Sequence, residues 1–276
     1  MLNSLKKLFR APPARPLPAI PAGQRVYAVG DVHGRLDLLV ALAEAIEYDN
    51  AARNEAPAKL GGGGRAESTV ILLGDLVDRG PDSAGVLTAT RMWASQRKLR
   101  IIAGNHEEMF LESLENTDQL RHFLRYGGRE TILSYPIAAE DYSAAEIGEL
   151  QEMLLERVPA EHVEFIRSFE DVITIGDYVF VHAGIAPGVP LEEQRLGHLR
   201  WIREPFLSHE GDHGFVVVHG HTITGEIEVL PNRIGIDTGA YESGRLSALC
   251  LEGTERWLIE TSDHDGSVTT ASRAIA

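Results

Sequence analysis

Val70 to Gly80 reads Val-Ile-Leu-Leu-Gly-Asp-Leu-Val-Asp-Arg-Gly, an apolar run that ends in a polar turn between two glycines. A continuous apolar run of this length predicts a fully buried strand of a parallel sheet. That strand would deliver Asp75 to the carboxyl edge of the sheet, where open α/β sheets bind ligands. Asp78 and Arg79 follow within four residues. The stretch is therefore either a catalytic loop or an unusually polar turn, and similar stretches elsewhere distinguish the two.

Two more stretches repeat this order of apolar strand, polar turn and helix. Residues 25–29 would form a buried strand that ends at Gly30-Asp-Val-His-Gly34, and residues 99–103 one that ends at Gly104-Asn-His-Glu107. Right-handed crossovers place the ends of successive parallel strands at one edge of a sheet. The polar residues of the three turns should therefore converge. They are Asp31, His33, Asp75, Asp78, Arg79, Asn105 and His106.

The rest of the chain divides into a helical middle and a C-terminal part rich in strands. Residues 107–170 contain no apolar run of strand length, which predicts a helical insertion or cap. From Val172 the pattern predicts a hairpin that ends at His182, a strand that ends at His219, and four further short strands. We therefore predict an α/β fold with two sheets flanked by helices, in which the C-terminal half adds a mostly antiparallel sheet.

Composition narrows the class of protein. The 276 residues, 43% of them hydrophobic, suit one large domain, which we place at residues 24–276. The net charge of -15 argues against binding to nucleic acid or to an anionic membrane, because phosphate attracts basic surfaces. Cys250, the single cysteine, excludes an internal disulfide and suits a reducing cytoplasm, where we expect the protein to act. Its strand-like surroundings predict a buried, inert thiol.

Two segments are predicted to be flexible. Residues 1–10 are basic and apolar but too short and interrupted for a membrane span or a signal peptide, and residues 11–21 are rich in proline. This favours a flexible arm over residues 1–23 rather than a membrane-surface anchor. Gly61 to Gly64 lies in a polar stretch and lacks the spacing of a phosphate-binding loop, so we predict a plain surface loop.

The strand ends also supply the donor atoms of a metal centre. Carboxylate, imidazole and amide donors suit manganese, iron, zinc or magnesium better than a thiolate-type site does. A carboxylate can bridge two cations about 3.5–4 Å apart, which then activate a water and bind phosphoryl oxygens. One such residue alone is more often structural, but five strand ends that carry them point to a metal centre. The candidate ligands are Asp31, His33, Asp75, Asn105, His182 and His221.

The three turns resemble the signature motifs of the metallophosphatase superfamily. The Val-Asp-Arg-Gly and Asn-His-Glu forms resemble the serine/threonine phosphoprotein phosphatase family, most of all its compact bacterial and phage members. Three C-terminal motifs extend the resemblance over about residues 25–250: His182-Ala-Gly184, His219-Gly-His-Thr222 and Gly235-Ile-Asp-Thr-Gly239. The resemblance implies the two-sheet calcineurin-like architecture and two bound divalent ions, Mn2+ first, with Fe, Zn or Mg as alternatives.

The resemblance also implies a role for each matching ligand. The first metal would be held by Asp31 and His33, the second by Asn105, His182 and His221, and Asp75 would bridge them. His219 competes with His221, because strand alternation points residues two apart in the same direction. The Gly-His-Thr form of the family favours His221.

Catalysis would involve a further set of residues. His106 would be the general acid that protonates the leaving oxygen, and Asp78 would hold its imidazole and favour the protonated form. Arg79, Asn105 and, in Trp201-Ile-Arg-Glu204, Arg203 would bind the phosphate, since the planar fork of Arg gives bidentate contacts. The resemblance implies direct attack by a hydroxide bound to both metals, without a phosphoenzyme.

The implied partner is a phosphorylated protein or peptide, with phosphoserine or phosphothreonine as substrate and phosphotyrosine left open. The alternative is a dinucleoside polyphosphate hydrolase that splits diadenosine tetraphosphate. Relatives of that kind tend to have Val-Ala-Arg-Gly and Asn-His-Asp where this chain has Asp78 and Glu107. A third reading, a noncatalytic metal-binding scaffold, is disfavoured because ligands, acid and phosphate-binding arginine are all present. The sequence leaves the physiological substrate, any regulatory subunit and the oligomeric state open.

Overall fold

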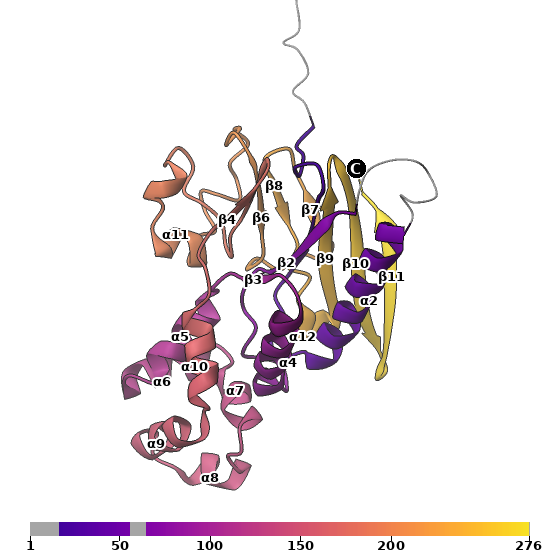
Figure 1. Ribbon diagram of the computed structural model, residues 1–276. Helices are drawn as coiled ribbons and strands as arrows, with labels where there is room; N and C mark the ends of the chain where they lie inside the picture. Colours follow the sequence, from indigo (N-terminus) through magenta and orange to yellow (C-terminus); the bar gives the residue numbers. More distant parts are fainter. Residues whose placement is uncertain (1–16, 56–64, 276) are drawn as a thin grey trace, which may run out of the picture.

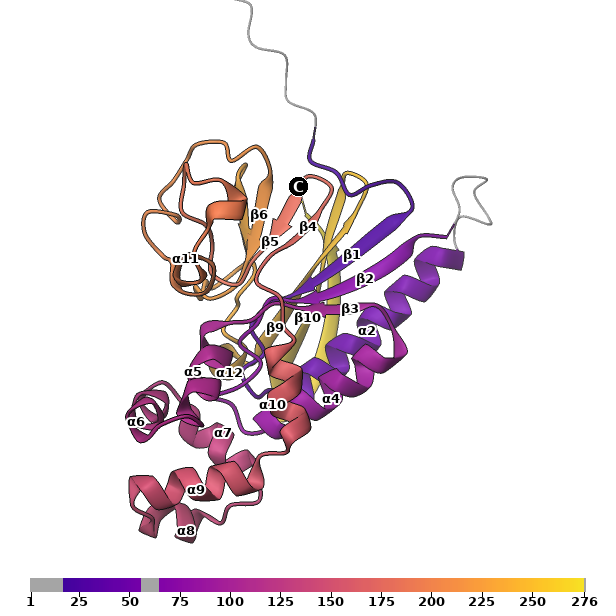
Figure 2. The same cartoon turned by 60° about the vertical axis from the view of Figure 1, so that its left-hand side comes forward.

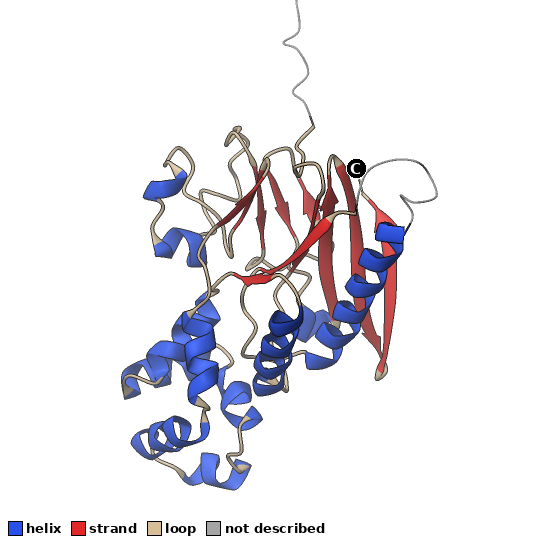
Figure 3. Ribbon diagram, in the orientation of Figure 1, coloured by secondary structure: helices blue, strands red, loops and turns tan. Residues whose placement is uncertain are grey.

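Two sheets pack face to face, with helices on the outside and a separate group of helices at one end (Figures 1 and 3). The computed structural model describes residues 17–55 and 65–275. The predicted α/β fold, two sheets flanked by helices, is confirmed. The predicted glycine loop at Gly61 and most of the predicted N-terminal arm lie outside the described residues.

The first sheet has six strands in the order β11-β10-β9-β1-β2-β3. Its parallel part consists of β1 (Gln24–Val29), β2 (Glu67–Leu72) and β3 (Leu99–Ile101). Its antiparallel part consists of β9 (Arg245–Glu252), β10 (Glu255–His264) and β11 (Ser267–Ala274). The carboxyl ends of β1, β2 and β3 consequently meet at one edge, as predicted.

The second sheet has the order β4-β5-β6-β8-β7. Its strands are β4 (Ile173–Ile175), β5 (Tyr178–Phe180), β6 (Val216–His219), β7 (Glu228–Val229) and β8 (Arg233–Gly235). The prediction that the C-terminal half adds a mostly antiparallel sheet is wrong in two respects. Strands β5, β6 and β8 are parallel. The long strands β9 to β11 join the first sheet instead, because β9 is buried on both faces and pairs with β1.

Alternating side chains of the strands divide between two hydrophobic layers. Val26 and Ala28 of β1 point between the sheets, whereas Tyr27 and Val29 point outward. The outward side is covered by α2 (Leu36–Glu55) and α4 (Ser83–Gln96) (Figure 2). The outer face of the second sheet is covered near α11 (Leu196–Trp201), while η1 (Leu191–Glu193) and α12 (Ala240–Ser243) are short connecting helices.

Six helices form a lobe at one end of the sheets (Figures 1 and 2). They are α5 (Asn105–Ser113), α6 (Thr117–Arg125), α7 (Gly128–Ser134), α8 (Ala139–Ala144), α9 (Ile147–Arg157) and α10 (Ala160–Arg167). These helices fill the stretch 107–170 that the sequence predicts as a helical insertion. The two ends of the lobe lie side by side, because Ala103 N–H donates to Glu170 O and Glu170 N–H to Ile101 O, each at 2.8 Å.

The packed part of the chain begins before residue 24. Ile20 is buried, packs in the layer between the sheets, and donates its N–H to the carbonyl oxygen of Gly253 at 2.8 Å. The last residues of the predicted flexible arm are therefore part of the folded domain. Cys250 is buried in β9, as predicted, and burial raises the pKa of its thiol well above the usual value. Within residues 17–55 and 65–275, no helix is long and apolar enough to cross a bilayer.

His162 of α10 anchors the lobe to α4. Its Nδ1 lies 3.0 Å from Tyr135 Oη and its Nε2 lies 3.2 Å from Thr88 Oγ1. Thr88 Oγ1 donates its one hydrogen to Ala84 O, so it can only accept from His162. The neutral ring of His162 therefore donates from Nε2 and accepts a hydrogen bond from the Tyr135 hydroxyl at Nδ1. Burial lowers the pKa of His162, and Arg91 lowers it further against the opposing effect of Glu161.

We predict that His162 makes the folded state more sensitive to acid. Above the ordinary histidine pKa of about 6.5, the ring is neutral in both states. Below it, the unfolded chain takes up a proton that the folded chain resists, so the free energy of unfolding falls. A change from pH 7 to pH 5.5 should therefore lower Tm less in H162Q than in the wild type, as measured by thermal unfolding. H264Q, at the exposed end of β10, is the matched control, and an equal loss of Tm in H162Q and the wild type would contradict the prediction.

Candidate metal centre

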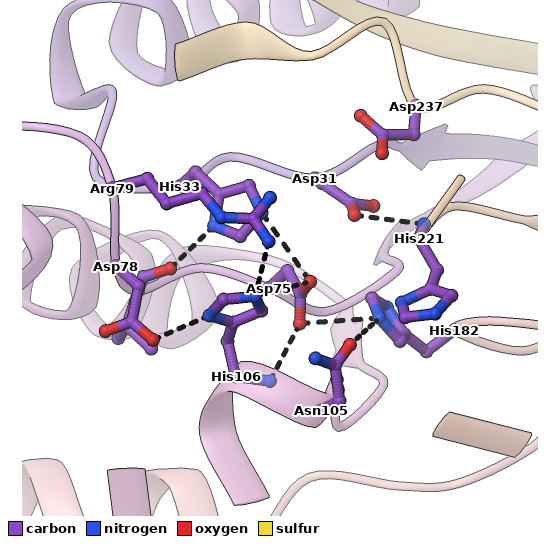
Figure 4. Close-up of polar contacts among 12 residues, drawn as sticks. Asp31, His33, Asp75, Asp78, Arg79, Asn105, His106, His182, His221 and Asp237 are labelled. Carbon is purple, nitrogen blue, oxygen red and sulfur yellow. Dashed lines mark hydrogen bonds and ion pairs between the residues drawn. The ribbon is translucent and has the colours of Figure 1, made fainter. Parts of the chain in front are cut away.

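Polar side chains from both sheets meet at the carboxyl ends of the parallel strands (Figure 4). Strands β1, β2 and β3 lead to the turns that carry Asp31, Asp75 and Asn105. Strand β5 leads to His182 and β6 to His221. These five side chains are at most 9% exposed. The convergence predicted from the strand ends is therefore present across two sheets.

The turns adopt a backbone conformation that residues with side chains rarely adopt. Five residues of the site have positive φ: His33 (45°), Asp75 (49°), Asp78 (73°), Arg79 (68°) and His221 (63°). Each costs on the order of 1–3 kcal/mol and persists only where its surroundings fix it. Here the first turn bonds to the second, because the N–H groups of Val32 and His33 both donate to Asp75 O, at 3.1 and 2.8 Å.

The donor atoms form two triplets that share Asp75. One contains His33, Asp75 and His106, the other Asp75, His182 and His221, and within each triplet the atoms lie within 4.8 Å of one another. Asp75 has Oδ2 at 3.6 Å from His33 Nε2 and Oδ1 at 3.4 Å from His182 Nε2. A carboxylate placed between two groups of ligands is the arrangement of a bridging ligand.

Backbone carbonyls hold two of the imidazoles with Nε2 turned toward Asp75. His33 Nδ1 lies 2.8 Å from Val77 O, and His182 Nδ1 lies 2.7 Å from Leu73 O. A carbonyl only accepts, so Nδ1 of each ring carries a hydrogen, and Nε2 is the nitrogen that faces the site. Burial lowers the pKa of His33 and of His221 to about 3, which keeps both rings neutral, the form that binds metal.

Two buried ligand atoms in this region lack a hydrogen-bond partner within the described chain: Asp31 Oδ1 and His221 Nε2. Asp31 Oδ2 accepts the N–H of His221 at 3.0 Å. Burial, together with Asp237 and Asp75, raises the pKa of Asp31 well above its usual value. Buried carboxylates with open oxygen atoms, beside neutral imidazoles, are a donor set that a divalent cation satisfies. The residues therefore fit a metal centre.

His106 and Asp78 form a buried pair beside this centre. His106 Nδ1 lies 2.6 Å from Asp78 Oδ2, and both residues are at most 1% exposed. Burial lowers the pKa of His106, but the carboxylates of Asp75 and Asp78 outweigh it and raise the pKa above the ordinary value. An imidazole whose pKa is raised and which borders a cavity is suited to general acid catalysis once its Nε2 carries a proton.

A cavity of about 290 Å³ opens over these groups. Arg79 reaches its floor, where it donates to His33 Nε2 at 3.1 Å and to His106 Nε2 at 3.0 Å. Arg203 lines the same cavity from the loop after α11. The other residues that line it are Asp75, Asn105, His106, Tyr126, Trp201, His221, Thr222, Ile223 and Tyr241. Two guanidinium groups and an amide above paired ligand clusters suit an anionic phosphoryl group.

Glu107 braces the bridging turn from beneath. Its carboxylate accepts the N–H groups of Asp75 at 2.9 Å, Leu76 at 2.7 Å and Gly104 at 2.9 Å. Gly104 itself must be glycine, since a Cβ there would overlap Asp75 Oδ1. Glu107 thus joins the second and third motifs, and it orients the turn rather than reaching the cavity.

His219, the less favoured alternative to His221, lies apart from the two ligand triplets, and Asp237 lies close to the site. His219 belongs to neither ligand triplet; its Nε2 faces Arg233 at 3.4 Å and its ring packs edge-on against Phe206. Asp31, a predicted ligand, is also outside both triplets and lies beside Asp237 (Figure 4). The sequence analysis assigned no role to Asp237, although it follows strand β8 in the same manner as the other site residues follow theirs.

Fold and site together define a metal-dependent phosphoesterase. The chain belongs to the calcineurin-like phosphoesterase family, whose sequence profile matches residues 24–246. No substrate follows from this membership alone.

Relatives with different activities resemble the chain to a similar degree. It is 26% identical to serine/threonine-protein phosphatase 1 of Salmonella typhimurium, over 81% of this chain and 90% of that protein. It is 25% identical to bis(5'-nucleosyl)-tetraphosphatase PrpE of Bacillus velezensis, over 85% and 92%. A solved cold-active protein tyrosine phosphatase superposes with a TM-score of 0.55 at 21% identity, over 93% and 80%, which supports the fold alone.

We predict that E107Q weakens metal binding. The amide cannot accept at its nitrogen, so backbone N–H groups of the bridging turn lose their partner and Asp75 loses its fixed position. Manganese affinity, measured by titration calorimetry, should fall about 10- to 100-fold. The free energy of unfolding should fall by about 1–3 kcal/mol. E115Q, at an exposed position in the turn after α5, is the control. Unchanged manganese affinity in E107Q would rule out this role.

Proposed function

We propose that the protein is a metal-dependent phosphoprotein phosphatase that hydrolyses phosphoserine and phosphothreonine monoesters. The pairing of His106 with Asp78 is the observation that carries this proposal. The leaving group of a phosphoserine ester is a strongly basic alkoxide, which needs a proton as the bond to phosphorus breaks. The leaving group of a dinucleoside polyphosphate is itself a phosphate anion and needs that proton less. A buried, carboxylate-supported imidazole suits the first substrate better.

Two divalent ions, for which Mn2+ is our choice in vitro, would be held by Asp75 together with five further residues. Those residues are Asp31, His33, Asn105, His182 and His221. When bound, the ions would activate water and neutralise the charge of the phosphoryl group. Asn105 already faces the second group of ligands, since its Oδ1 lies 3.0 Å from His182 Nε2.

The protein's own side chains would orient the substrate and supply a proton. Arg79 and Arg203 would bind the phosphate oxygens, where planar guanidinium groups hold an in-line geometry. As Arg79 turns to the phosphate, it releases His106 Nε2, to which it now donates. That nitrogen, which carries no hydrogen while it accepts from Arg79, then takes up a proton from solvent, as the raised pKa of His106 favours, and can pass it to the leaving oxygen. Asp78 keeps the proton-bearing ring oriented throughout.

One set of observations favours dinucleoside polyphosphates as the second candidate. Tyr126, Trp201 and Tyr241 surround the cavity, and aromatic rings there would stack a nucleobase. A relative of similar identity is named for that activity. We rank this candidate second because a phosphate leaving group has little need of the proton that His106, paired with Asp78, would supply.

The substrate class can be measured directly. With added Mn2+, the purified protein should release phosphate from a phosphoserine peptide faster than it splits diadenosine tetraphosphate at equal concentration. The two substrates are followed by phosphate release and by nucleotide chromatography. Faster cleavage of the dinucleotide would be compatible with the proposed metal centre but would contradict the proposed substrate class, phosphoserine and phosphothreonine esters.

H106N should separate catalysis from a structural role of the site. Removal of the proton donor should lower kcat on the phosphoserine peptide by about 10²- to 10⁴-fold. Bound manganese, measured by elemental analysis, should remain at the wild-type level, because the six proposed ligands are intact. Full activity in H106N would show that the imidazole is not the acid, and absence of activity in the wild type would support the scaffold reading.

A further inference from the structure

The helical lobe reaches into the turn that carries Asp78 and Arg79. The carbonyl oxygen of Gly127, before α7, accepts the N–H of Arg79 at 3.0 Å. Thr131, within α7, accepts the N–H of Asp78 at Oγ1 at 2.8 Å. Asp78 and Thr131 are fully buried, so neither can exchange its partner for water. The part of the lobe around α7 is thus bonded to the catalytic turn through one carbonyl group and one hydroxyl group.

The hydrogens of this network can be assigned. Thr131 Oγ1 lies 2.6 Å from Asp78 Oδ1 and 2.9 Å from Ser83 Oγ. A hydroxyl has one hydrogen to donate and two lone pairs, whereas a carboxylate oxygen only accepts. Thr131 therefore donates to Asp78, and Ser83 donates to Thr131. The hydroxyl of Thr131 therefore makes two hydrogen bonds with Asp78 and one with Ser83, which is all that a hydroxyl can make.

The two oxygens of Asp78 are held by two different helices of the lobe. Oδ1 accepts from Thr131 of α7, and Oδ2 faces Nδ1 of His106, at the start of α5, at 2.6 Å. The terminal torsion of an aspartate is broad, so a carboxylate held at one oxygen can turn. Held at both oxygens, its plane is fixed, and the plane of the imidazole that it bonds is fixed as well.

We propose that Thr131 is a positioning residue, through which α7 of the helical lobe sets the direction of proton delivery from His106. The proposal rests on the proposed role of His106 as the proton donor. It assigns the lobe a part in the chemistry rather than only a wall of the cavity. The neighbouring contact needs glycine, since Gly127 has φ +103° and a Cβ there would lie 2.6 Å from Arg79 Cγ.

The test compares leaving groups. T131V keeps the shape of the side chain and removes the hydroxyl, and T131S restores it. Phosphoserine peptide needs a protonated leaving group, whereas p-nitrophenyl phosphate, with its stable phenolate, hardly does. T131V should lower kcat on the peptide by about 10- to 100-fold and on p-nitrophenyl phosphate by less than about threefold. T131S should return both toward the wild type.

Two further variants control the comparison. T90V makes the same change at a buried threonine of α4 whose hydroxyl has no partner in the described chain, and both activities should be unchanged. In an H106N background, T131V should lower kcat on the peptide by no more than about twofold, because the effects of mutating residues that act as one unit are not additive. An equal loss on both substrates, or an additive loss in H106N, would overturn the proposal.

Failure of the proposed function is seen separately, in the wild type. If the wild type hydrolyses no phosphopeptide, that function fails, and phenyl phosphate, a poorer leaving group than p-nitrophenyl phosphate, takes the place of the peptide in the comparison. If T131V does not fold, T131C is used, whose thiol is a weak donor. For T131C, the ratio of kcat on the peptide to kcat on p-nitrophenyl phosphate should lie between the ratios for T131S and H106N. A ratio equal to that of the wild type would overturn the proposal.

Discussion

The charge of Asp75 is the constraint on which the rest of the site depends. It lies between His33, which follows the first sheet, and His182, which follows the second. Burial of an unpaired carboxylate costs several kcal/mol, and burial alone would raise the pKa of Asp75. The imidazoles of His182 and His106 outweigh burial and hold that pKa well below its usual value. Both sheets must therefore end at the same point, or the charge would lose its partners.

Around that charge, the three N-terminal motifs act as one hydrogen-bonded block. The first bonds to the second through Asp75 O, and the third bonds to the second through Glu107. These bonds offset the cost of the left-handed backbone at His33 and Asp75, which isolated turns would not adopt. The glycines of the motifs permit backbone to approach backbone closely, which the block requires. Motif residues that never reach the substrate are thus as necessary to the geometry as the ligands.

The sequence predicted correctly which turns meet at one edge, because each follows a local signal, an apolar run that ends in glycine or a polar residue. It could not assign strands β9 to β11 to a sheet, since pairing of Val26 with Leu251 depends on contacts across the whole chain. Ile20 was missed because one apolar residue in a proline-rich stretch has no period. Asp237 carried the same strand-end signal as the ligands and could have been found. Thr131 could not, because its partner is 53 residues away.

The adjoining ends of the lobe, at Ala103 and Glu170, have an evolutionary consequence. An insertion whose two ends lie side by side can be lengthened, shortened or exchanged at little cost in closure entropy. Such a change to the lobe need not move β3. Substrate selection could therefore diversify by recombination at this junction while the two sheets stay the same. A replacement lobe would have to keep the start of its first helix, which carries Asn105, His106 and Glu107, and the contacts through Gly127 and Thr131.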